Sequence, residues 1–596
     1  MDAGLHRAAQ LLRVGRAQEA VSVLDALLSS EPGNVEALQL RGMARGHLGR
    51  FEAGAADLEA AAKRHPQPHA VQNNLGNLRR RAGDIDGAMA AYRAALAVMP
   101  RFADAALNMA SCLAETGKLE EAAVRYRSVL DTVPDHPQAL NGLGAVLLRL
   151  DRFEEAVTAF DRALARDGNA VRPLVNRGAL HRRTKHFEAS LADLERACRL
   201  APEMAEAHFQ LGHTLRTVGR LEAARQAYRE AVRRAPLRAD IHRDLAGLLW
   251  EMGEGEGATA ELDAVLSARP DAGLYYIKGR ILMRTRQPQR AAEAAAAALA
   301  VDPGHAAALA MQGEIRGKLG DVARGLEDLR AALAASGGGD FEIRHQLVET
   351  CLAAGRAEEA LEALDAEPPP AHLQKHVALQ ATAWRCMGDD RYHRLYDYDR
   401  LTAKRFIQTP AGYASLDEFN LALTQSIERL HATKAQPIEQ TLFGGTQSPG
   451  RLWDVDDPVI RALGGALLEA AYSFVSSLPD EADHPFLRRR TGRLALSGAW
   501  SVRLHSGGGH VDHIHPAGWI SASYYVKVPQ SVLDGDKAGW LRLGAPGIAD
   551  LDLPAERYIR PEAGAAIFFP SYMWHGVEPF ESDEVRITAP FDLLPE

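Results

Sequence analysis

The sequence predicts a multidomain protein in which an all-α solenoid of repeats is followed by a β-barrel with flanking helices. Two observations carry this prediction. Proline and glycine recur every 34 residues through the first two thirds of the chain, and beyond residue 490 the sequence changes to short alternating segments rich in β-branched and aromatic residues. A chain of 596 residues is also too long for one hydrophobic core, so at least two domains are expected.

The proline and glycine series define the repeating unit. The prolines are Pro32, Pro66, Pro100, Pro134, Pro202, Pro236 and Pro270, and the glycines are Gly15, Gly49, Gly83, Gly117, Gly219 and Gly253. The glycine suits the turn after a first helix, and the proline suits the break before the next unit. A single helix–turn–helix unit cannot bury its own apolar face, so neighbouring units must stack into a solenoid.

These repeats resemble the tetratricopeptide family, whose period is 34 residues. About ten or eleven units are expected in residues 1–390, with residues 371–390 as a degenerate last unit or a cap. The resemblance implies a superhelix whose concave face binds a protein or peptide. Asn74, Asn108 and Asn176 share one register of the repeat, where their amides would hydrogen-bond an extended peptide backbone. In the alternative interpretation they are polar residues of a solvated helix face.

Charge and composition exclude some functions. The chain has 69 Lys and Arg against 78 Asp and Glu, and its net charge of −9 argues against a nucleic-acid binder with a large basic surface. The four cysteines form no CxxC pair, which predicts buried thiols in a reducing, cytoplasmic compartment. We expect no membrane span and no signal peptide, because the sequence lacks a run of roughly 18 apolar residues and a basic N-terminal stretch before an apolar one.

Residues 391–596 are predicted to form the second domain. Helical segments are expected at residues 417–432 and 458–478 of a lead-in that ends near residue 485. Residues 490–596 are expected to form the barrel, because short strand-like segments alternate there with glycine and proline. The strands are predicted at residues 500–504, 520–528, 565–569 and 585–588.

Histidines within this β-rich part are candidate metal ligands. Side chains two residues apart on a strand point to the same face, so His513 and His515 offer two ligands and His575, on a later strand, offers a third. Three ligands on one face of an octahedron leave positions open for a bidentate co-substrate and O2, as in a non-haem Fe(II) centre. Histidine would stand at residue 515 in place of the usual carboxylate.

A competing ligand pair is present in the same segment. His510 and Asp512 form a literal histidine–x–aspartate motif, and on a regular strand they share the face opposite to His513 and His515. Only one of the two pairs can serve the metal unless the strand bulges. The residue pattern by itself leaves both pairs open.

From about residue 395 to the end, the chain is similar to the 2-oxoglutarate/Fe(II)-dependent oxygenases often found behind tetratricopeptide repeats. The matching motifs are residues 445–447, 500–504, 513–521, 523–526, 538–540, 568–576 and 586–588. The resemblance implies a double-stranded β-helix, or jelly-roll, barrel. It also implies that His513, His515 and His575 bind the metal and that Arg586 binds the co-substrate. Supporting or structural roles are expected for His505 and His510.

The expected function is that of a hydroxylase that uses Fe(II), O2 and 2-oxoglutarate, with Arg586 holding a carboxylate of the co-substrate through its two-pronged guanidinium. The repeats would recruit the protein or peptide partner. Two alternatives stay open: a three-histidine, cupin-like metal protein that does not use 2-oxoglutarate, and a non-catalytic tetratricopeptide scaffold. The sequence does not predict the substrate.

Overall fold

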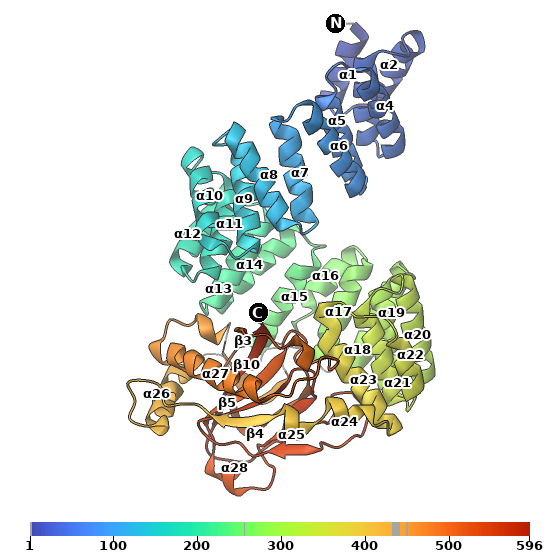
Figure 1. Ribbon diagram of the computed structural model, residues 1–596. Coiled ribbons are helices and arrows are strands. Elements are labelled where there is room, and N and C mark those ends of the chain that lie inside the picture. The colour runs from blue at the N-terminus through green and yellow to red at the C-terminus, as the bar shows by residue number, and fades with distance from the viewer. Residues whose placement is uncertain (1–2, 255–256, 286, 432–440, 449–450) are drawn as a thin grey trace. The chain divides into compact units, whose positions relative to one another are not determined.

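The computed structural model describes residues 3–254, 257–285, 287–431, 441–448 and 451–596 (Figure 1). The chain divides into two compact units, Met1–Arg234 and Ala235–Glu596. Helical pairs make up the first unit, and the second begins with further helical pairs and ends with a curled antiparallel β-sheet. The predicted order of an all-α solenoid followed by a jelly-roll β-structure is confirmed. The predicted domain boundary at residue 390 falls inside the second unit and stays a prediction.

In the first unit, the first helix of each pair contacts the first helix of the next pair, for example α5 with α7 and α9 with α11. In a curved stack, the helices that approach one another line the inner side, so the odd-numbered helices line the inner face of this unit. The helices are α1 (Ala3–Arg13), α2 (Ala17–Ser30), α3 (Val35–His47), α4 (Phe51–Arg64), α5 (His69–Arg81), α6 (Ile85–Val98), α7 (Ala103–Glu115), α8 (Leu119–Thr132), α9 (Pro137–Arg149), α10 (Phe153–Arg166), α11 (Val171–Arg183), α12 (Phe187–Leu200), α13 (Ala205–Thr217) and α14 (Leu221–Arg234).

The periodic glycines have a backbone cause. Gly49 and Gly83 lie in the turns between the two helices of their pairs with φ angles of 74° and 83°, in the left-handed region that favours glycine. The glycine series is interrupted at two positions, and there Asp151 and Lys185 adopt the same conformation, with φ angles of 58° and 64°. The turn geometry therefore persists where glycine is missing, at a cost of roughly 1 kcal/mol per residue.

A second small-residue register lets the paired helices approach closely. A Cβ atom at Gly76 would lie 2.4 Å from the Tyr92 ring, and one at Gly144 would lie 2.5 Å from the Phe160 ring. Both rings are fully buried. The large ring of the second helix therefore fills the space that the glycine of the first helix leaves open.

The second unit continues the helical pairs and then adds shorter helices around the sheet. Helix α23 ends at Gly388, whose φ of 68° terminates the helix. The helices are α15 (Ala239–Glu251), α16 (Ala260–Ala268), α17 (Ala272–Arg284), α18 (Pro288–Val301), α19 (Ala306–Lys318), α20 (Val322–Ala335), α21 (Phe341–Ala353), α22 (Ala357–Ala363), α23 (Leu373–Met387), α24 (Arg391–Leu395), α25 (Tyr398–Leu401), α26 (Leu416–Glu428), α27 (Pro458–Ser477) and α28 (Gln530–Asp534).

Within the described residues, the sheet has ten strands in the order β1-β8-β5-β10-β4-β9-β6-β7, with β2 paired to β4 and β3 paired to β10. All of the pairings are antiparallel. The strands are β1 (Ala403–Phe406), β2 (Leu442–Gln447), β3 (Leu494–Ala499), β4 (Val502–His513), β5 (Ile520–Lys527), β6 (Leu541–Leu543), β7 (Arg557–Ile559), β8 (Ala565–Pro570), β9 (His575–Val577) and β10 (Arg586–Pro595).

Two long strands curl this sheet. The first part of β4 pairs with β10 and its last residues pair with β9, whereas β2 pairs with β4 from Val502 to His510. Strand β10 pairs with β4 at its start and with β3 at its end. Each long strand changes partner along its length, so the sheet curves. A cavity can form on the concave side of the curved sheet.

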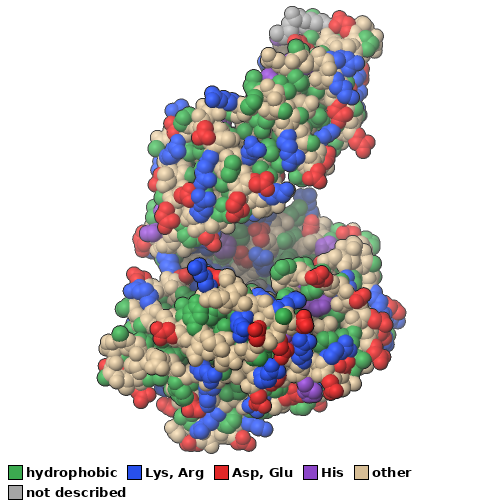
Figure 2. Space-filling model, in the orientation of Figure 1, with side chains coloured by type: hydrophobic (Ala, Val, Ile, Leu, Met, Phe, Trp, Pro, Cys, Tyr) green, Lys and Arg blue, Asp and Glu red, His purple; other side chains and the backbone are tan. Residues whose placement is uncertain are grey.

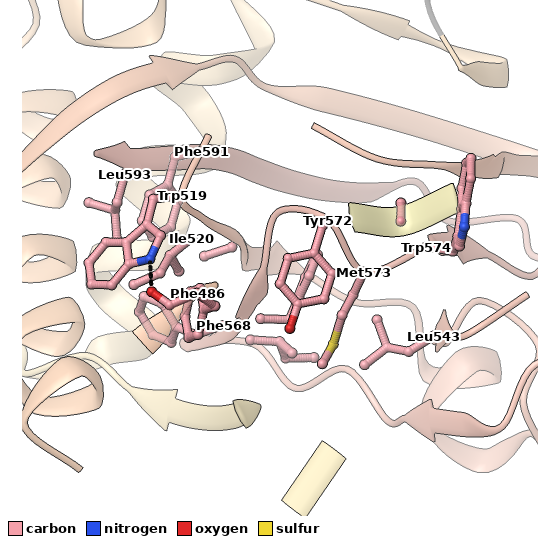
Figure 3. Packing of buried hydrophobic residues seen from close by; sticks show 14 of the residues in the cluster. Phe486, Trp519, Ile520, Leu543, Phe568, Tyr572, Met573, Trp574, Phe591 and Leu593 are labelled. Atoms are coloured by element: carbon pink, nitrogen blue, oxygen red, sulfur yellow. Dashed lines mark hydrogen bonds between the residues drawn. The ribbon is translucent and has the colours of Figure 1, made fainter. Parts of the chain in front are cut away.

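The core of the second unit runs without interruption from its last repeats into the sheet. Figure 3 shows its aromatic part, in which the Trp519 indole N–H donates a hydrogen bond to the Phe486 carbonyl over 2.9 Å. Helix α27 packs on β1, β8 and β3, and its Phe474 ring stacks on Phe568. Among the described residues, α27 is the one helix long and apolar enough, by length and composition alone, to cross a membrane.

Figure 2 shows Lys and Arg side chains intermingled with Asp and Glu side chains on the visible surface of each unit. Ion pairs also connect helices in the first unit, where Arg41 of α3 pairs with Asp25 of α2 and with the buried Asp57 of α4. This mixed surface accords with the net charge of −9.

Candidate metal centre

Three histidines converge at one end of the β-structure. His513 is the last residue of β4, His515 follows two residues later, and His575 opens β9 directly opposite His513. The ring centroid of His575 lies 4.2 Å from that of His513 and 4.9 Å from that of His515. One ring nitrogen from each residue lies within 4.8 Å of the other two. This spacing allows all three nitrogens to bind one metal ion.

The Nδ1 atom of each ring lies close to a hydrogen-bond acceptor, and this acceptor determines which ring nitrogen carries the proton. The acceptors are the Val511 carbonyl, 2.8 Å from His513 Nδ1, the Met573 carbonyl, 3.0 Å from His575 Nδ1, and Asp592 Oδ1, 2.6 Å from His515 Nδ1. A carbonyl or a carboxylate oxygen only accepts, so each Nδ1 carries the proton and each Nε2 keeps a free lone pair. Metal-binding histidines are usually held in this way.

Burial keeps the imidazoles of His513 and His575 neutral. Burial, together with the neighbouring His515 ring, lowers the pKa of His513 to about 3. Burial also lowers the pKa of His575 well below the ordinary histidine value, since that side chain is only 6% exposed. Neutral imidazole is the form that binds a metal, so the pair is ready to do so at neutral pH.

The local backbone differs from the regular strand that the sequence suggested. Strand β4 ends at His513, so His515 lies beyond the strand, where its N–H donates to the Ser571 carbonyl over 3.0 Å. The pairing of β4 with β9 also shifts register between His510 and His513. A bulge breaks the alternation of side chains at that point. The two histidines therefore meet through a strand end and a turn, and the expectation of two ligands from one regular strand is wrong.

The competing pair is split by the same bulge. His510 lines the cavity beside His513, and the Thr441 hydroxyl lies 3.3 Å from its Nδ1. Asp512 lies outside the cavity lining and accepts two hydrogen bonds from Arg542, at 2.8 and 2.7 Å. His505 is exposed and does not line the cavity.

Arg586 opens β10 and lies in the same cavity wall, with its side chain fully buried. Among the described residues, it has no ion-pair partner, and its Nε has no hydrogen-bond acceptor. Its guanidinium carbon lies 5.1 Å from the centre of the Tyr525 ring, whose hydroxyl is also without a partner. Burial lowers the pKa of Arg586, but an arginine side chain stays charged at neutral pH. A buried cation without a counter-charge favours an anionic ligand.

The histidines and Arg586 share one cavity of about 280 Å³. Its apolar walls include Trp500, Phe569 and Pro590. Sequence reasoning missed several members of the site, among them Thr441, Tyr525 and Asp592. Of these, only Asp592 could have been noticed in the sequence, because an acidic residue is unusual inside the apolar run of β10.

The segment before His575 is held by residues of α23 and of the chain that follows it. The Trp574 indole N–H donates to the Thr382 hydroxyl of α23 over 3.0 Å. The Tyr396 hydroxyl accepts from the Trp574 backbone N–H at 3.1 Å and donates to the Tyr572 carbonyl at 3.2 Å. Figure 3 shows Tyr572, Met573 and Trp574 among the buried hydrophobic residues of the core. Helix α23 and Tyr396 therefore help to position one of the candidate ligands.

The asparagines predicted for partner binding lie on first helices of the first unit and are half-buried. The Asn108 amide N–H donates to Asn73 at 3.0 Å, and the Asn176 amide N–H donates to Asn141 at 3.0 Å. Asn74 instead lies 3.7 Å from the Met43 sulfur. All three side chains thus contact the first helix of the preceding pair.

Comparisons with known protein families agree with this arrangement. Residues 7–68, 107–171 and 276–340 match one tetratricopeptide repeat model, and residues 79–124 and 215–281 match another. Residues 498–592 match the family described as "Putative 2OG-Fe(II) oxygenase". The chain therefore carries tetratricopeptide repeats in its helical part and a domain of this oxygenase family at its C-terminal end.

Solved structures resemble the helical part. A tetratricopeptide repeat protein from Parabacteroides merdae is 22% identical, with 45% of this chain and 93% of that chain covered and a TM-score of 0.31. A thermophilic repeat protein from Thermus thermophilus is 20% identical, with 30% of this chain and 99% of that chain covered and a TM-score of 0.29. A search of curated proteins gave no match.

Proposed function

We propose that this chain is an Fe(II)- and 2-oxoglutarate-dependent hydroxylase whose repeats recruit a protein or peptide partner. One observation carries the proposal. Three histidines with free Nε2 atoms and a buried, unpaired Arg586 line the same cavity. The histidines suit a divalent metal, and Arg586 suits a carboxylate. 2-Oxoglutarate is a ligand that binds both to a metal and to a carboxylate-binding residue.

The donor set fits iron. Imidazole suits Fe(II), and three neutral donors leave open positions for further ligands. When bound, Fe(II) would supply the redox chemistry in which O2 converts R–H and 2-oxoglutarate into R–OH, succinate and CO2. His513, His515 and His575 would hold the ion, and their Nδ1 acceptors would keep each ring in its orientation.

Arg586 would hold the distal carboxylate of 2-oxoglutarate, with the Tyr525 hydroxyl as a second donor. The apolar walls formed by Trp500 and Phe569 would exclude water from the reacting end. His510 also lines the cavity and stacks beside His513 at a centroid distance of 5.9 Å. We assign it a supporting role in ligand placement.

Turnover of the co-substrate tests the proposal. Purified full-length protein, loaded anaerobically with Fe(II) and then exposed to O2, is expected to convert 2-oxoglutarate into succinate slowly even without its substrate. Omitting either the metal or O2 should stop succinate release. The control is the His513→Ala variant under the same conditions.

Within the described residues, no carboxylate joins the three histidines, which favours a second candidate, a three-histidine metal protein that does not use 2-oxoglutarate. This candidate predicts tight metal binding with no effect of 2-oxoglutarate on the metal. Stoichiometric metal binding without succinate release, and without a 2-oxoglutarate-dependent change in the Fe(II) absorption spectrum, would establish it in place of the hydroxylase.

For the repeats, we propose that Asn74, Asn108 and Asn176 bind the backbone of an extended segment of the partner. Their position on the inner helices and their shared register support this. Alanine at all three positions is expected to reduce capture of protein partners without loss of helicity by circular dichroism. A matched control replaces Asn34, the cap of α3, which would lower stability but not capture.

We also propose that the protein works in the cytoplasm. The four cysteines are free thiols in the structure. Cys112 and Cys351 are buried, but Cys198 is half-buried and Cys386 is exposed, so the expectation that all four are buried is wrong. Free thiols are typical of a reducing compartment. Fractionation of cells that produce the full-length chain would test this proposal.

A further inference from the structure

The His515 ring differs from the other two in its outer partner. His513 and His575 donate from Nδ1 to neutral backbone carbonyls, whereas His515 donates to the Asp592 carboxylate. Among the described residues, Asp592 is the one carboxylate that hydrogen-bonds any of the three histidines. It is also 8% exposed, so little water screens its charge.

The Asp592 side chain is held in one orientation by its neighbours on the sheet. It lies near the centre of β10, opposite Ser521 of β5 and Gly498 of β3. The Ser521 hydroxyl donates to the same Oδ1 at 2.7 Å, and the Ser571 hydroxyl lies 2.9 Å from that of Ser521. The carboxylate therefore has little freedom to turn away from His515.

The turn after His515 leaves room for this arrangement. A Cβ atom at Gly518 would lie 3.2 Å from Asp592 Oδ1 and 2.4 Å from Ser571 Oγ. A larger residue at this position would push Ser571 Oγ and Asp592 Oδ1 out of their places. The chain thus combines a glycine, two serines and one aspartate around the outer side of a single imidazole.

We propose that Asp592 is the positioning residue of the metal centre and supplies, one imidazole away from the metal, the negative charge that a three-histidine ligand set lacks. This inference rests on the proposed metal centre. The 2.6 Å hydrogen bond makes the His515 ring more electron-rich and fixes the direction of its Nε2. His515 thereby takes on part of the character of a carboxylate ligand.

The test separates the charge from the hydrogen bond. In the Asp592→Asn variant, the amide oxygen can still accept from Nδ1 but carries no charge. In the Asp592→Leu variant both are lost. Outer partners of metal-bound histidines change metal affinity by about 10- to 100-fold, so we expect Co(II) affinity to fall roughly tenfold for Asn and about 100-fold for Leu. The Co(II) absorption spectrum should shift in both variants, a signature that a purely structural role would not produce.

The matched control is Asp512→Asn, which removes a half-buried carboxylate of β4. Asp512 accepts its hydrogen bonds from Arg542 and not from an imidazole. This variant is expected to keep the Co(II) affinity and spectrum of the unaltered protein. An Asp592→Asn variant that is folded and binds Co(II) within twofold of the unaltered protein would overturn the proposal, even if the Leu variant fails to fold. Failure of the unaltered protein to bind Co(II) would overturn the proposed metal centre as well. Metal binding without 2-oxoglutarate turnover would refute only the hydroxylase.

Discussion

Replacing His575 with alanine is expected to abolish stoichiometric binding of Fe(II) or Co(II), while the helical content of the protein stays unchanged. His575 supplies one of three nitrogens, and two remaining imidazoles cannot enclose the ion on one face. The repeats should stay folded, because the stability of a solenoid comes mainly from contacts between neighbouring units. Isothermal titration with Co(II) and circular dichroism measure the two quantities.

The control for this experiment is His505→Ala, which removes an exposed histidine of β4 that does not line the cavity. It should bind the metal like the unaltered protein. Unchanged affinity in the His575→Ala variant would contradict the metal centre. Loss of affinity in both variants would indicate binding by surface histidines.

The second large effect is expected from Arg586→Lys. The metal should bind as before, but the affinity for 2-oxoglutarate should fall roughly tenfold to a hundredfold, which corresponds to about 1.4 to 3 kcal/mol. A lysine ammonium carries the same charge but cannot reproduce the two parallel hydrogen bonds of a guanidinium. Anaerobic titration of the Fe(II)-loaded protein with 2-oxoglutarate measures this affinity.

The matched control is Arg557→Lys, an exposed arginine of β7 that pairs with Asp399. Its replacement should leave the affinity for 2-oxoglutarate unaltered. Equal affinities in the unaltered protein and in the Arg586→Lys variant would remove the main argument for 2-oxoglutarate and favour the cupin-like alternative. Loss of metal binding in the variant would mean that Arg586 supports the fold and does not serve the co-substrate.

Much of the helical part could be predicted because its rules are local. A turn residue every 34 positions and a small residue opposite each large ring follow from backbone and packing constraints that act within one unit. Even so, Asp151 and Lys185 show that the turn conformation survives without glycine, so the period was more informative than any single residue.

The site was less accessible to sequence reasoning, because its geometry depends on contacts between distant segments. The side-chain alternation that favoured His513 and His515 ends at the bulge before His513, and the register of β4 against β9 is set by residues about 60 positions apart. Nothing near His515 in the sequence indicates that its partner is Asp592, 77 residues further on. The residue types indicated the kind of site, but only the folded structure shows that these residues lie close together.

The repeats and the candidate centre are physically continuous within the second unit. Thr382 of α23 and Tyr396 hold Trp574, which directly precedes His575. The hydrophobic core likewise passes from the helices to the strands without a break. A truncated chain that begins after α23 would lose one hydrogen-bond partner of the ligand-bearing segment, so the metal centre is best studied in the full-length protein.

The most direct test of the metal centre is anomalous X-ray diffraction from crystals of the full-length protein grown with Co(II) or Fe(II), measured at the absorption edge of the metal. We expect one strong anomalous peak about 2.0–2.2 Å from Nε2 of His513, His515 and His575. A peak bound by His510 and Asp512, or no peak near His575, would contradict the assignment.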